Sequence, residues 1–90
     1  MPVAVEMTFP GATLDQYDQV MGLMALEQVP DGALFHWVAQ TGDGLKVVDV
    51  WETREAFDAF AAEKIGPLSA QVGLAPPGIA YHDVHNHMSA

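Results

Sequence analysis

The strongest structural signal in the chain is the stretch ALFHWVAQTGDGLKVVDVWE, residues 33–52. Two runs rich in β-branched and aromatic residues flank Gly42-Asp43, and a short glycine–aspartate loop between such runs is typical of a β-hairpin. We therefore predict antiparallel strands at about 33–40 and 45–52. Alternation along these strands puts apolar side chains on both faces of the hairpin: Leu34, Val38 and Val47 on one face, and Phe35, Trp37, Val48 and Val50 on the other.

The sequence before the hairpin predicts one strand and one helix. Along residues 3–9, every second side chain belongs to a more apolar set that would lie on one face, which is typical of a half-buried strand. Thr13 followed by Gln16 forms a capping box, which satisfies the first free backbone amides of a helix. We expect this helix to be closed by Pro30-Asp31-Gly32, because proline cannot continue a helix and Asp-Gly turns readily.

The sequence after the hairpin predicts a second helix and a last strand. Thr53 is a suitable helix cap, and Gly66-Pro67 is expected to end that helix, with a short helical turn around residues 68–72. Residues 79–87 then predict the last strand. The resulting β-α-β-β-α-β order is that of a ferredoxin-like α+β fold with an antiparallel sheet, here as one domain spanning residues 1–90.

Two helices can cover only one face of this sheet, although both faces of its hairpin are apolar. A sheet that is apolar on both sides needs a second covering layer. An identical sheet from a second copy would supply it, so we expect a homodimer with a barrel-like interface, a dimeric α+β barrel, in which Trp37 is an interface anchor. The sequence does not decide which face meets the helices.

Composition excludes several classes of function. The chain has 90 residues, a formal net charge of −9 and no cysteine. Only three lysine and arginine residues stand against 12 aspartate and glutamate residues, too few for a protein that binds nucleic acids or anionic membrane surfaces. The lack of cysteine excludes a disulfide framework, a thiolate nucleophile and a zinc–cysteine site. No apolar run reaches the length of a membrane span, and we expect a cytoplasmic protein.

Residues 47–60, VVDVWETREAFDAF, resemble the antibiotic biosynthesis monooxygenase-like domains of the dimeric α+β barrel superfamily. The resembling pattern is a strand that ends in an acidic residue, one residue and Trp, followed by a polar turn and a helix with Glu-Ala-Phe. The resemblance implies a homodimer with a pocket between helices and sheet. It also implies activities such as cofactor-free oxidation of phenolic or quinol-type substrates, or haem degradation; related barrels include polyketide cyclases and lactone isomerases.

The chain departs from that family in one respect. Many members carry a histidine on the second helix nine residues after the Trp, and here Phe60 holds that position. The haem-degrading branch also uses an Asn in the first strand, and residues 3–9 contain none. These departures argue against haem chemistry, and we expect no cofactor.

The hairpin itself predicts a polar pair. If the turn is centred on Gly42-Asp43, His36 lies opposite Asp49, Val38 opposite Val47, and Leu34 opposite Trp51, all on one face. Facing residues of an antiparallel pair have β-carbons about 4.5–5.5 Å apart, so imidazole and carboxylate can form a hydrogen bond. The functional interpretation is that His36 and Asp49 are catalytic, and that Trp51, Leu34 and Val38 bind substrate. The alternative is that the pair only ties the two strands together, or meets the partner subunit.

The last strand holds three of the four histidines. We expect Tyr81 or His82 to line the substrate pocket, without a basis for choosing which of the two faces inward. Asp83, His85 and His87 would share a strand face and form a two-histidine, one-carboxylate ligand set. Three successive residues along one strand converge poorly on one ion, so we expect no metal.

The sequence thus predicts a homodimer that binds a small apolar or aromatic molecule. The leading hypothesis is a cofactor-independent monooxygenase that acts on phenolic or quinol-type substrates through a His36–Asp49 proton-handling pair. Two alternatives stay open: a polyketide cyclase or isomerase on the same scaffold, and a non-catalytic binding or interaction dimer. Neither the substrate nor the occurrence of turnover follows from the sequence.

Overall fold

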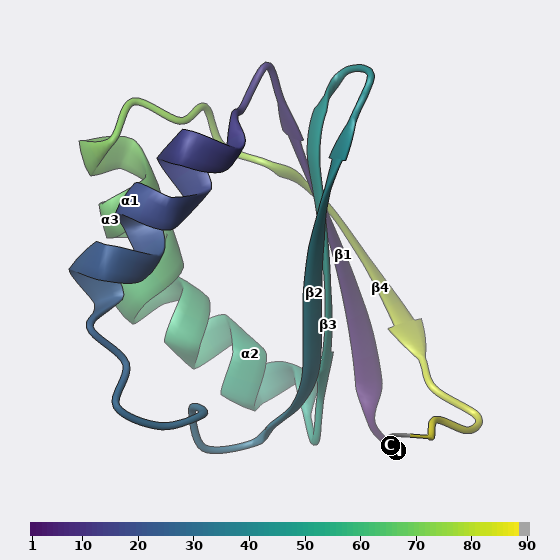
Figure 1. Cartoon of the computed structure of the whole chain (residues 1–90). Coiled ribbons are helices and arrows are strands. Elements are labelled where there is room, and N and C mark those ends of the chain that lie inside the picture. The colour runs from purple at the N-terminus through teal and green to yellow at the C-terminus, as the bar shows by residue number, and fades with distance from the viewer. Residues whose placement is uncertain (89–90) are drawn as a thin grey trace.

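The computed structural model describes residues 1–88 and has the predicted α+β architecture (Figure 1). Its elements are β1 (Val3–Pro10), α1 (Leu14–Met24), β2 (Ala33–Thr41), β3 (Gly44–Trp51), α2 (Arg54–Phe60), a π-helical turn (Ala61–Ile65), α3 (Gly66–Gln71) and β4 (Gly78–Asp83). The four strands form one sheet in the order β2-β3-β1-β4, and every neighbouring pair is antiparallel. This order confirms the ferredoxin-like prediction.

The helices cover one face of the sheet and leave the other face uncovered (Figure 1). Strand β1 shows which face is which, because its apolar side chains are buried at every second position: Val3, Val5, Met7 and Phe9. Val5 pairs with Asp49 of β3, so the covered face is the one that carries Asp49 and Trp51. The helices therefore pack over the predicted polar pair.

Helix α1 begins as predicted and ends earlier. Thr13 and Gln16 form the capping box. The helix ends at Met24, where Ala25 adopts a left-handed conformation with φ of 50°, so the prediction that the helix is closed at Pro30-Asp31-Gly32 was wrong. The physical reason is the left-handed Ala25, whose amide donates to the carbonyl of Met21 and turns the chain out of the helix, so that residues 26–30 continue as a loop.

The second helix does not end at Gly66-Pro67. Residues 61–65 form a π turn in which the Gly66 amide donates to the carbonyl of Ala61, and α3 continues directly from it. Pro67 has no amide hydrogen, and its ring would clash with the carbonyl of a regular preceding turn. The wider π turn accommodates the proline, and three helical segments follow one another without a break.

The hairpin register agrees with the prediction except at its open end. His36 lies opposite Asp49 and Val38 opposite Val47, as predicted. A bulge between Ala33 and Phe35 makes Ala33, not Leu34, the partner of Trp51. The chain is closely packed just before this place, because a β-carbon on Gly32, which has φ of 88°, would lie 3.1 Å from the β-carbon of Ala56. The prediction of a Leu34–Trp51 pair was therefore wrong.

Strand β4 is shorter than predicted. It ends at Asp83 instead of reaching residue 87, so His85 and His87 do not continue its face. None of the helices within residues 1–88 combines the length and apolarity that a bilayer span requires.

Candidate active site

A cavity of about 530 Å³ lies between the helices and the covered sheet face. Its volume falls in the range of small-molecule pockets, about 300–1,000 Å³. Apolar side chains from the strands and helices make up most of its wall: Met7, Phe9, Val20, Met21, Met24, Leu45, Val47, Phe60 and Ile65. The loop from Leu26 to Pro30 and Leu34 of β2 also line it. The cavity is therefore largely apolar. Its polar side chains are Glu27 and Gln28 of the loop, Ser69 of α3, and a group gathered at one further place.

That place is the predicted pair. His36 Nδ1 lies 2.5 Å from Asp49 Oδ1, and both residues line the cavity. The two side chains differ in exposure: 42% of the His36 side chain is accessible, against 8% for Asp49. Cross-strand pairing in β2 and β3 fixes their separation, because the two residues face each other directly. The carboxylate is thus enclosed behind an imidazole that remains reachable.

Trp51 holds the same carboxylate from the other side. Its Nε1 donates to Asp49 Oδ2 at 3.1 Å, and the residue is 2% exposed. Phe57 packs edge-on against the indole with ring centroids 5.8 Å apart, and Phe60 packs at 5.3 Å. Both oxygens of Asp49 are therefore engaged by donors whose positions are set by the hairpin and by the helix packed on it.

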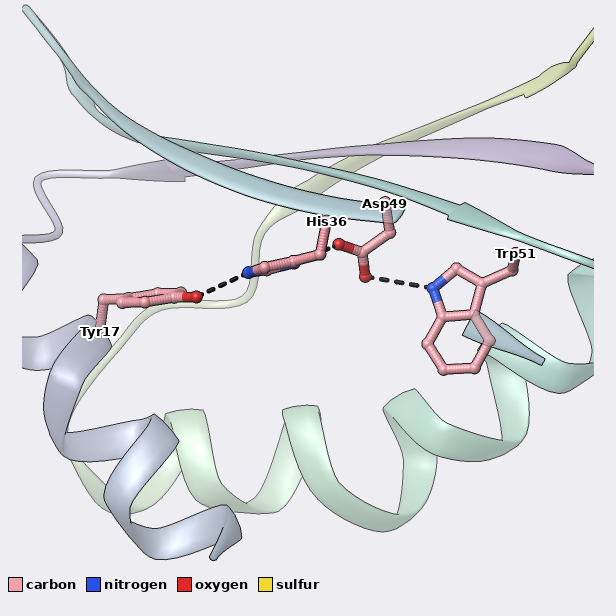
Figure 2. Close-up of polar contacts among 4 residues, drawn as sticks. All are labelled: Tyr17, His36, Asp49 and Trp51. Carbon is pink, nitrogen blue, oxygen red and sulfur yellow. Dashed lines mark hydrogen bonds and ion pairs between the residues drawn. The ribbon is translucent and has the colours of Figure 1, made fainter. Parts of the chain in front are cut away.

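Tyr17 of α1 completes a chain of four side chains, which Figure 2 shows running from helix to sheet. Its hydroxyl lies 2.6 Å from His36 Nε2. Burial raises the pKa of the Tyr17 phenol, and the negative charges of Asp49 and Asp18 raise it further. Tyr17 was not among the predicted site residues, because on the sequence it belongs to the apolar stripe of α1. Its hydroxyl was the available signal, since a partly buried tyrosine hydroxyl usually finds a partner.

The chemistry of the donors assigns a direction to this chain. An indole nitrogen only donates and an ionised carboxylate only accepts, so the Nδ1 of His36 donates to Asp49. In the neutral imidazole, Nε2 then accepts the hydrogen bond of the Tyr17 hydroxyl. His36 is thereby held in the tautomer whose basic nitrogen faces Tyr17 and the cavity.

The remaining predicted residues lie in different places. Leu34 lines the cavity together with Trp51, whereas Val38 packs against the core and is not part of the cavity wall. Tyr81 donates a hydrogen bond to Asp58 at 3.0 Å, and the Arg54 guanidinium lies 3.7 Å above its ring. The structure therefore brings Leu34 and Trp51 to the His36–Asp49 pair, but not Val38 or Tyr81.

His82 lies on the uncovered sheet face. It pairs with Ala4 of β1, and its Nε2 lies 3.5 Å from Glu6 Oε2. His82 is thus separated by the sheet from the cavity that holds His36. Within residues 1–88, no three histidine, aspartate or glutamate side chains are close enough together to hold a metal ion.

The chain resembles known proteins in its structure. No protein-family model matches the sequence, and no curated protein matches it. An antibiotic biosynthesis monooxygenase-like protein from Chloroflexus aurantiacus superposes with a TM-score of 0.66 at 18% identity, covering 98% of both chains. SnoaB, a cofactor-independent oxygenase from Streptomyces nogalater, gives a TM-score of 0.62 at 15% identity, covering 99% of this chain and 97% of its own.

A third similar structure is the monooxygenase ActVA-Orf6 of Streptomyces coelicolor in complex with nanaomycin D. It has a TM-score of 0.57 and 24% identity, and covers 99% of this chain and 91% of its own. This chain has their fold. The resemblance noted at residues 47–60 therefore extends to the architecture of almost the whole chain, from β1 to β4.

Proposed function

We propose that this protein is a cofactor-independent monooxygenase that oxidises small phenolic or quinol-type aromatic molecules. The observation that carries the proposal is the 2.5 Å contact between His36 Nδ1 and Asp49 Oδ1 in the wall of an otherwise apolar cavity. An imidazole oriented by a buried carboxylate is a suitable general base for an acidic phenol or an activated carbon acid. The oxygenases SnoaB and ActVA-Orf6, which share the fold, support this class of reaction.

The cavity wall indicates the charge of the substrate. Among the described residues, neither lysine nor arginine lines the cavity, whereas Glu27 and Asp49 do. A carboxylated substrate would therefore enter a site with no fixed positive partner and with two like charges, which is unfavourable in a partly desolvated space. We expect an uncharged aromatic substrate, with Trp51 and Leu34 in contact with its ring.

The main task of the protein in this reaction is to accept one proton from the substrate. Transfer of a proton to His36 leaves an electron-rich substrate anion, and Asp49 stabilises the imidazolium that forms. The anion passes an electron to O₂, and the two radicals combine into a peroxide anion. This anion takes the proton back from His36 to become a hydroperoxide, and loss of water leaves a carbonyl group. Overall a methylene group and O₂ become a carbonyl group and water, with one oxygen atom retained in the product.

We further propose that the uncovered sheet face joins a second copy of the chain. Trp37 of β2 pairs with Val48 of β3, and Phe35 pairs with Val50, on the face opposite His36. Phe35 and Trp37 keep 44% and 40% of their surface exposed in the single chain. Contiguous apolar surface of this kind favours an identical partner related by a two-fold axis.

The test is oxygen consumption with a panel of uncharged anthrones and hydroquinones, each paired with its carboxylated analogue. We expect uptake with the uncharged member of a pair and its loss in His36→Ala, with the fold retained by circular dichroism. Glu52→Gln, a surface variant outside the cavity wall, is the control and should behave as the original. Substrate conversion without oxygen uptake would instead support a cyclase or isomerase. Binding without conversion would support a non-catalytic dimer.

A further inference from the structure

Both ring nitrogens of His36 are already occupied in the structure. Nδ1 is held by Asp49, and Nε2 lies 2.6 Å from the Tyr17 hydroxyl. An incoming substrate therefore finds no free nitrogen on the proposed base. The first polar atom on the cavity side of that base is the oxygen of Tyr17, because Tyr17 itself lines the cavity.

We infer that Tyr17 is a catalytic residue that takes the substrate proton and passes its own proton to His36. This inference rests on the proposed function, in which His36 is the final proton acceptor. It adds the group that touches the substrate, which neither the hairpin pattern nor the shared fold assigns.

The geometry of the two rings suits a relay. The planes of Tyr17 and His36 differ by 11°, with centroids 6.0 Å apart. Figure 2 shows the hydroxyl of Tyr17 directed at the imidazole nitrogen of His36. The lone pair of Nε2 lies in the imidazole plane, so a hydroxyl in nearly the same plane is aligned for proton transfer.

The proton balance closes without a further reactant. A substrate O–H or activated C–H bond breaks and its proton binds Tyr17 Oη, while the Tyr17 O–H bond breaks and that proton binds His36 Nε2. Tyr17 ends neutral, the substrate ends as an anion, and the imidazolium is paired with Asp49. A lasting tyrosinate is not required, which agrees with the raised pKa of Tyr17 caused by burial and by the charges of Asp49 and Asp18.

The competing interpretation is that Tyr17 is only a cap that moves aside so that substrate reaches Nε2 directly. The two interpretations differ in the effect of Tyr17→Phe, which removes the hydroxyl and keeps the ring. A relay predicts slower turnover, because the connecting oxygen is lost. A cap predicts equal or faster turnover, because the base is then open.

The matched control is Tyr81→Phe. Tyr81 is the only other tyrosine of the sequence, and its hydroxyl contacts Asp58 outside the cavity wall. We expect Tyr17→Phe to lower kcat roughly 10²-fold, at the lower end of what general acid–base groups contribute. The dependence of kcat on the deuterium content of the solvent should be curved in the original protein, since two protons move, and linear in the variant. Tyr81→Phe should keep the original rate and the curved dependence.

A binding experiment tests the contact without any turnover. The probe is 4-nitrophenol, a neutral acidic phenol at mildly acidic pH, titrated by calorimetry. A relay predicts weaker binding by Tyr17→Phe, about tenfold, because the phenol loses a hydrogen-bond partner, with no change in Tyr81→Phe. Unchanged or tighter binding by Tyr17→Phe, or no binding by the original protein, would overturn the inference.

The two proposals fail in different ways. If His36→Ala is inactive while Tyr17→Phe keeps full kcat, the relay is wrong and the proposed function stands. If no panel compound consumes oxygen but 4-nitrophenol binding depends on the Tyr17 hydroxyl, the monooxygenase proposal is wrong and Tyr17 remains the ligand contact.

Discussion

Replacing Asp49 with Asn should invert the tautomer of His36. The carboxylate accepts from two groups, His36 Nδ1 at 2.5 Å and Trp51 Nε1 at 3.1 Å. An amide has one accepting oxygen and one donating nitrogen, and the indole can only donate. The amide oxygen must therefore face Trp51 and its NH₂ group must face His36. Nδ1 then has to accept, so the imidazole proton moves to Nε2 and donates to the Tyr17 oxygen.

The size of the effect follows from the same contacts. Hydrogen bonds to a charged group contribute about 1.5–3 kcal/mol and neutral ones about 0.5–1.5 kcal/mol, so weakening two bonds costs roughly 2 kcal/mol. Part of this cost is offset, because the variant no longer buries a charged carboxylate. The net loss in unfolding free energy should be about 1–2 kcal/mol. Catalysis should suffer far more, with kcat/KM lower by roughly 10²–10⁴-fold, because the basic lone pair now points at the amide instead of the cavity.

Long-range ¹H–¹⁵N NMR distinguishes the two neutral tautomers of a histidine directly. The His36 signals can be assigned by their absence in His36→Ala, which leaves the three other histidines. We expect the Nδ1–H form in the original protein and the Nε2–H form in Asp49→Asn. Asp58→Asn is the control, since Asp58 accepts from Tyr81 outside the cavity wall. An unchanged tautomer in Asp49→Asn, or undiminished turnover, would refute the reasoning.

Three further predictions test the pKa shift, the core and the uncovered face. In a Tyr81→Phe background the only tyrosine left is Tyr17, and its ultraviolet titration midpoint should lie above the ordinary 10.0. Because the unfolded chain then loses this proton first, stability should fall as pH rises past 10, and less so when Tyr17 is replaced by Phe. Phe57→Ala, at a position 0% exposed, should lower the unfolding free energy by about 3–5 kcal/mol in urea titrations. Trp37→Glu should give monomers by light scattering, whereas Leu23→Glu, an equally exposed change on α1, should stay dimeric.

The order of the elements was predictable because each has a local signal. The Gly42-Asp43 turn and the capping residues Thr13 and Thr53 act over a few residues, and all three behave as the sequence indicates. The early end of α1 and the passage of the helix through Pro67 were not predictable in this way. Both depend on what the neighbouring residues pack against, which local patterns do not contain.

Identifying the covered face required one observation that only the structure gives, the register between β1 and β3. Strand β1 buries every second side chain, and its antiparallel pairing with β3 puts Val5 opposite Asp49. A ferredoxin-like order of elements by itself implies that these two strands are neighbours. Tyr17 could not be assigned to the site in this way, since its contact with His36 depends on the position of α1 along the sheet. No spacing in the sequence fixes that distance.

The bulge in β2 explains why the predicted pair survived an error in the predicted register. Pairing is counted outward from the turn, and the irregularity lies beyond His36, between Ala33 and Phe35. The pair His36–Asp49 therefore depends only on the regular part of the hairpin. The bulge changes the cross-strand partner of Trp51 from the predicted leucine to Ala33. The indole nitrogen of Trp51 donates to Asp49 Oδ2. The extra residue of the bulge thus leaves the contact between Asp49 and His36 unchanged, and it puts the small Ala33 opposite Trp51, which makes the second contact of the carboxylate. The two contacts together hold the carboxylate that fixes the tautomer of His36, on which its action as a base depends.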